Sequence, residues 1–264
     1  MQIKNKVKKL FILILLSFVC SGNVSADEFN IVASEILLDK ENNIITGKGS
    51  VEVTDNKGKI IKADNVVYEK SKELLKFDGS VEFLDVEGNT LKTDKATYDK
   101  NREIITTYEN SKLEIKEGYT LTSNKILYLT IEKRISSDLN SSLKDQDGNL
   151  VTVSMFEYHL QKNLFSSIGK IQILDTNNNK YYFKEIHVDT KKKEMIGSDV
   201  SVVLDQENFG LTKKFDPRFV SNDIYVSKNK SNFQKGVFTV CKNREGKCPP
   251  WSLKAKKITH DKLK

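Results

Sequence analysis

The sequence predicts an elongated all-β protein built from hairpin repeats of about thirty residues, preceded by a signal peptide. Two independent series of residues, each repeated every thirty positions and here called ladders, lead to this prediction. Tyrosines recur at Tyr68, Tyr98, Tyr128 and Tyr158. Turn glycines recur at Gly58, Gly88, Gly118 and Gly148, and Asn178 continues the series. Between the ladders, apolar and polar residues alternate, which is typical of strands with one buried face.

The first element is a targeting segment, residues 1–26. Lysines at positions 4, 6, 8 and 9 precede the apolar run Leu10–Val19, and small residues follow at Val24-Ser25-Ala26. This order is that of a secretory signal peptide, and we expect cleavage after Ala26. The apolar run is too short for a spanning helix, which needs about 20 residues.

The repeat unit that follows reads as strand, turn, strand, turn. One copy runs from Lys62 to Tyr68, turns, continues from Glu73 to Phe83, and turns again at Asp85–Gly88. Gly79 lies inside the second strand and predicts a bulge or bend there. Six copies cover residues 33–204, and a degraded seventh covers residues 222–240. A single hairpin cannot bury its apolar face, so the copies are expected to stack.

The alternation assigns one set of residues to the interior of the stack. These residues are Val51, Val66, Tyr68, Val81, Phe83, Ala96, Tyr98, Ile126, Tyr128, Phe156, Tyr158 and Ile186. An ordinary closed core and an open apolar groove would both need this inner face, so periodicity leaves the two alternatives open.

The charge is concentrated at the two ends of the chain. The net charge of +7 falls to +3 when the four lysines of residues 1–26 are removed, and residues 241–264 alone carry +6. The body, residues 27–240, therefore has a net charge of −3 and gives no support to nucleic-acid binding. We expect three parts: a signal peptide (1–26), a repeat domain (27–240) and a basic segment (241–264) that contains Cys241 and Cys248.

The sequence carries no pattern typical of an enzyme. Nucleotide-binding glycine motifs, zinc-protease motifs and the nucleophile elbow are all missing. Two of the three histidines, His159 and His187, fall on the outward parity of their strands. Asp145 and Asp147 resemble the start of a calcium loop, but Phe156 stands where the closing glutamate belongs. We therefore expect no catalytic residue, metal site or cofactor.

The repeated motif Lys-Ala-Asp, then an apolar pair and Tyr-Asp/Glu-Lys, then Gly-Ser-Val-Glu-Phe, resembles the OstA-like domain of lipopolysaccharide export proteins. The segment from Phe238 through Cys248-Pro-Pro-Trp251 to Lys262 resembles the junction after the periplasmic domain in the outer-membrane LptD family. The resemblance implies a V-shaped β-jellyroll whose groove, lined by the inward residues above, shelters lipid A acyl chains. It implies a periplasmic location at the outer membrane.

The same resemblance implies three protein partners: a periplasmic bridge protein paired at the N-terminal edge near residues 31–39, an outer-membrane barrel, and its plug lipoprotein. No barrel signature follows the junction in this chain, so a fragment, a split reading frame and a separately encoded barrel are all open. The alternatives in function are a stand-alone periplasmic lipopolysaccharide bridge and a structural or adhesive β-solenoid without lipid. Cys241 and Cys248 are expected to form a disulfide with each other, or, by the resemblance, with a barrel.

Overall fold

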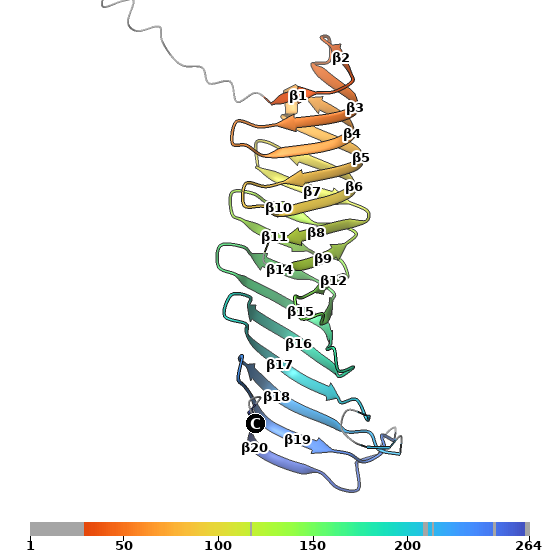
Figure 1. Cartoon of the computed structure of the whole chain (residues 1–264), viewed down its shortest axis with the longest axis vertical. Coiled ribbons are helices and arrows are strands. Elements are labelled where there is room, and N and C mark those ends of the chain that lie inside the picture. The colour runs from red at the N-terminus through yellow and green to blue at the C-terminus, as the bar shows by residue number, and fades with distance from the viewer. Residues whose placement is uncertain (1–28, 117, 208–210, 213, 245–246, 262–264) are drawn as a thin grey trace, which may run out of the picture.

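The computed structural model describes residues 29–116, 118–207, 211–212, 214–244 and 247–261. The expected signal peptide lies outside the described residues. The described chain forms one antiparallel sheet of twenty strands, drawn out along a single axis (Figure 1). The molecule is an elongated β-jellyroll, as the repeats predict.

The strands advance along the axis broadly in sequence order, although some strands in the middle pair with non-consecutive partners. They are β1 (Asn30–Val32), β2 (Glu35–Asp39), β3 (Ile44–Thr54), β4 (Ile60–Glu69), β5 (Leu74–Leu84), β6 (Thr90–Asp99), β7 (Ile104–Tyr108), β8 (Ser111–Ile115), β9 (Tyr119–Ser123), β10 (Leu127–Leu129), β11 (Arg134–Ser137), β12 (Ser141–Lys144), β13 (Leu150–Val153), β14 (Phe156–His159), β15 (Leu164–Leu174), β16 (Lys180–Asp189), β17 (Glu194–Val203), β18 (Arg218–Val226), β19 (Lys230–Thr239) and β20 (Leu253–Asp261). A single 3-10 turn, η1 (Lys70–Lys72), lies between β4 and β5.

Each long strand bends near its middle, and this bend folds the sheet lengthwise into two leaves. In β5 the pairing with β6 passes from Asp78↔Lys95 to Val81↔Thr93, so β5 has one extra residue at the bend. Gly79 occupies it with φ +78°, a conformation that suits glycine. The predicted bulge at Gly79 is therefore confirmed. In the middle of the molecule the long strands are interrupted, and each is divided into two short ones, as in β7 and β8.

Aspartates close the turns at one end of the strands. The Asp85 side chain accepts hydrogen bonds from the backbone N–H groups of Glu87 (2.9 Å) and Asn89 (2.9 Å). Gly88 follows with φ +94°, and Asn178 takes the same place in a later turn with φ +59°. The turn chemistry predicted from the glycine ladder is thus confirmed, because short polar side chains replace the missing backbone partners.

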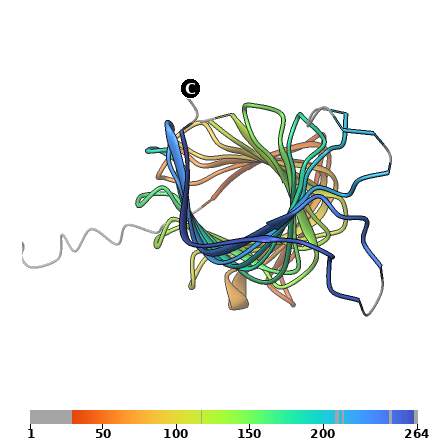
Figure 2. The same cartoon turned by 90° about the horizontal axis from the view of Figure 1, so that it is seen from below.

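The core lies between the inward faces of the two leaves. Seen along the long axis, the sheet curls on itself so that these faces oppose each other (Figure 2). Phe83 and Tyr128 meet edge to face there, with ring centroids 5.9 Å apart. Favourable aromatic contacts of this kind hold successive repeats in register.

The sheet extends past the boundary expected at residue 240. β20 pairs with β19 along its length, from Lys230↔Asp261 to Phe238↔Leu253. Nine of the 24 residues of the basic C-terminal segment therefore form the last strand of the jellyroll. Within the described part of the chain, no helix has the length and apolar character needed to cross a membrane.

Candidate functional site

The strand ends bring two rows of turns together on one side of the molecule, and we call the line between them the mouth. The first row consists of residues 55–59, 85–89, 145–149 and 175–179. The second row consists of residues 70–73, 100–103, 130–133, 160–163 and 190–193. Side chains join the rows across the mouth, as between Lys57 and Glu103 or between Asp147 and Lys193.

A cavity of about 450 Å³ lies in the C-terminal half of the interior. Its wall is apolar and comes from both leaves, with Phe165 and Ile186 buried and Ile173, Val188 and Met195 only partly buried. The remaining apolar members of the wall are Ile115, Tyr119, Leu143, Val151, Tyr158 and Val226. The volume falls in the range of about 300–1,000 Å³ that is typical of small-molecule sites.

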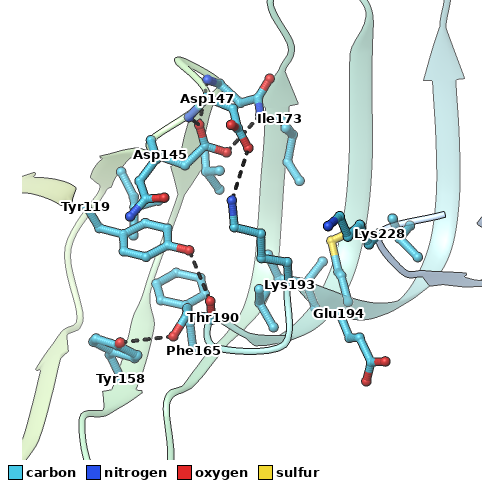
Figure 3. Close-up of a pocket in the computed structure, with 18 of the residues that line it drawn as sticks. Tyr119, Asp145, Asp147, Tyr158, Phe165, Ile173, Thr190, Lys193, Glu194 and Lys228 are labelled. Carbon is cyan, nitrogen blue, oxygen red and sulfur yellow. Dashed lines mark hydrogen bonds and ion pairs between the residues drawn. The ribbon is translucent and has the colours of Figure 1, made fainter. Parts of the chain in front are cut away.

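Polar and charged groups form the rim of this cavity (Figure 3). The hydroxyl of Tyr119 donates to the carbonyl of Thr190 (3.4 Å), and the Tyr158 hydroxyl lies 3.1 Å from the Thr190 hydroxyl. Lys193 reaches towards Asp147, with Nζ and Oδ2 3.9 Å apart. The site is therefore amphipathic: an apolar chain fits the wall, and a polar group fits the rim.

The N-terminal part of the mouth is closed by a buried carboxylate. Glu103 accepts hydrogen bonds from Lys57 (2.6 Å), Tyr98 (2.7 Å), Thr130 (2.9 Å) and Lys59. Burial raises the pKa of this carboxyl, but the four donors outweigh burial and hold its pKa at about 2. The side chain of Glu103 is only 11% exposed. This cluster binds the two rows firmly together.

A second contact lies one repeat further along the mouth. Lys133 and Glu87 pair at 3.1 Å, and the hydroxyl of Tyr128 donates to Asp85 (3.2 Å). Burial, followed by the negative charge of Asp85, raises the pKa of Tyr128, so the hydroxyl stays protonated and continues to donate. A smaller cavity of about 270 Å³ remains between this contact and Glu103.

The structure places all twelve residues assigned to the interior in the core. Each is at most 7% exposed: Val51, Val66, Tyr68, Val81, Phe83, Ala96, Tyr98, Ile126, Tyr128, Phe156, Tyr158 and Ile186. Only Tyr158 and Ile186 among them line the large cavity. The others pack against one another or border smaller spaces, and the part that the twelve play in lipid binding stays a prediction.

Sequence reasoning missed most of the cavity wall. Ile173, Val188 and Met195 have the inward parity of their strands, but alternation alone does not separate a wall residue from a core residue. Val188 is the thirtieth residue after Tyr158 and so continues the tyrosine ladder. Valine replaces the larger tyrosine at this position of the repeat, and this loss of side-chain volume is the sequence signal that could have indicated the cavity.

Cys241 and Cys248 are both free in the structure. The Cys241 thiol contacts the Trp251 carbonyl at 3.8 Å, and Cys248 is exposed. A hydrogen bond with Thr239 lowers the pKa of Cys241 and outweighs the opposing effect of burial. The expected disulfide is therefore not confirmed, and it stays a prediction.

His159 and His187 face outward, as their parity predicts. His159 pairs with Glu157 (2.6 Å), and His187 lies between Glu185 (2.9 Å) and Ser166 (2.9 Å) on the outer surface. Among the residues that the structure describes, no group of three or more His, Cys, Asp or Glu side chains is placed to hold a metal ion.

Comparison with known proteins adds a fold resemblance without a family assignment. No family model matches the chain, and no curated protein matches it. One similar solved structure is LptH, the LptA-homologous periplasmic component of the lipopolysaccharide transport device of Pseudomonas aeruginosa. It is 19% identical with a TM-score of 0.37, over 39% of this chain and 77% of LptH. Another is a mutant TCP10 domain of CPAP from Danio rerio, 11% identical with a TM-score of 0.14, over 55% of this chain and 95% of that domain. At these TM-scores neither likeness bears on what this chain does.

Proposed function

We propose that this chain binds the acyl chains of lipopolysaccharide in its interior and carries the lipid across the periplasm without catalysis. The observation that carries the proposal is the amphipathic cavity, with its apolar wall and its charged rim at the mouth. An acyl chain gains about 0.8 kcal/mol for each methylene removed from water. The head group would remain outside, between the two rows of turns.

The repeat motif supports lipopolysaccharide as the lipid, since the pattern resembles the OstA-like domain. A finer proposal follows from the segment between Cys241 and Trp251, which resembles the LptD junction. In this proposal the chain works at the outer membrane, together with a barrel and its plug lipoprotein. A bridge protein would deliver the lipid at the N-terminal edge, where β2 pairs only with β3 among the described strands.

Photo-crosslinking tests the proposal with two neighbouring positions. Tyr158 lines the cavity, whereas Glu157 lies on the outer face and pairs with Arg134 (2.8 Å). A photoreactive phenylalanine analogue at position 158 is expected to capture purified lipopolysaccharide, and the same analogue at position 157 is expected to capture none. Equal labelling at both positions, or labelling at neither, would contradict lipid binding in the interior. An adhesive solenoid without cargo predicts the second of these outcomes.

A further inference from the structure

The ion pairs across the mouth follow the thirty-residue period of the fold. Lys57 pairs with Glu103 at 2.6 Å, Glu87 with Lys133 at 3.1 Å, and Asp147 with Lys193 at 3.9 Å. In each pair the two residues are 46 positions apart, and the pairs follow one another at intervals of 30 and 60 positions, so they occupy equivalent places in different repeats. The sign of the charge is reversed between the first pair and the second, yet each pair is complementary. What recurs along the chain is therefore the pairing and not the residue type.

The three pairs differ in how well they are shielded from water. In the first pair Lys57 is 55% exposed, but Glu103 is only 11% exposed and receives three further donors. In the second pair Lys133 is 20% and Glu87 49% exposed. In the third pair Lys193 is 53% and Asp147 70% exposed. Water screens exposed ion pairs and leaves them weak, so the attraction across the mouth falls from the N-terminal end towards the C-terminal end.

One turn of the second row carries no charge at the paired position. Asn163 stands there, where the other turns have Glu103, Lys133 and Lys193. The large cavity lies in this section of the molecule, since Ile115, Tyr119 and Tyr158 belong to its wall. The open part of the interior thus coincides with the part of the mouth that is weakly held.

We propose that the cross-mouth pairs form a graded closure, so that lipid rests in the weakly held section beside Asp147 and Lys193 and occupies the N-terminal section only while the first two pairs are separated. This inference rests on the proposed binding of acyl chains. It assigns the resident lipid site to the C-terminal half of the interior. It also makes Glu103 and Lys133 positioning residues, which determine how far along the axis a chain can lie.

Two interior positions report the occupancy of the two sections. Phe83 borders the small cavity between the first and second pairs, and Ile173 lines the large cavity. With a photoreactive analogue at one position at a time and purified lipopolysaccharide as the probe, we expect strong labelling at position 173 and weak labelling at position 83. Equal labelling would overturn the graded closure while leaving lipid binding intact. Labelling at neither position would overturn both.

Charge reversal at the second pair tests the cause. Lys133→Glu is expected to raise labelling at position 83 about threefold, the shift expected for losing one partly exposed ion pair. The double reversal Glu87→Lys/Lys133→Glu restores the attraction and is expected to return labelling to the original level. Lys92→Glu is the matched control, because it breaks a pair with Glu82 (3.3 Å) on the outer face of the same section. Unchanged labelling in Lys133→Glu, or an equal rise in the control, would overturn the proposal.

Discussion

Replacement of Glu103 by glutamine is expected to destabilise the fold by about 2 kcal/mol at neutral pH. The pKa of Glu103 is held at about 2, against an ordinary value of 4.5. Since a tenfold change in a protonation equilibrium corresponds to about 1.4 kcal/mol, this difference is worth about 3 kcal/mol in full. Screening by water at the mouth, where Lys57 is 55% exposed, reduces it to about 2 kcal/mol. The amide keeps the shape of the side chain but cannot balance Lys57 and Lys59.

Urea unfolding followed by far-ultraviolet circular dichroism measures this difference at several pH values. A carboxyl whose pKa is lowered on folding contributes stability that is present above its unfolded pKa and is lost as the pH falls through its folded pKa. The difference in the free energy of unfolding between the wild type and Glu103→Gln should therefore have its full size above about pH 5 and should disappear as the pH approaches 2. Glu114→Gln is the control, since Glu114 pairs with Lys112 on the exposed outer face. If this difference were unchanged at pH 3, or if Glu114→Gln lost as much stability as Glu103→Gln, the reasoning would be refuted.

Two further predictions concern the bend and the cavity. Gly79→Ala is expected to lower the free energy of unfolding by about 2–4 kcal/mol, and Gly58→Ala by about 1–2 kcal/mol. Both glycines have positive φ, which disfavours alanine. Only at position 79 would the added Cβ also clash with a neighbour, since it would lie 2.9 Å from the Cβ of Asp64. Ile135→Ala should cost about 2–5 kcal/mol, since Ile135 is fully buried. Val188→Ala should cost about 1 kcal/mol or less, because its side chain already borders empty space. Urea midpoints check both pairs, and equal losses within either pair would contradict the corresponding argument.

Much of the fold could be predicted from the sequence because its determinants are local. Successive side chains of a strand point to opposite faces, so the sequence positions of Val66 and Tyr98 alone predict that both lie in the interior. The turns follow from aspartate, glycine and asparagine within five residues of one another, and the bend from Gly79. Stacking needs little further information, since the strands of each repeat pair with those of the adjacent repeats.

The sequence by itself determined the period, the inward face, the turns and the absence of recognisable catalytic motifs. Only the tertiary structure decided where the interior is filled and where it is open. That outcome depends on how closely the two leaves approach, and the contacts that control it, such as Lys57 with Glu103, join residues 46 positions apart. The register of β20 was likewise decided by its partner β19. Alternation reports which face of a strand is apolar, but it holds no information about the distance to the opposite leaf. A closed core and an open cavity therefore share one sequence pattern and differ only in long-range packing.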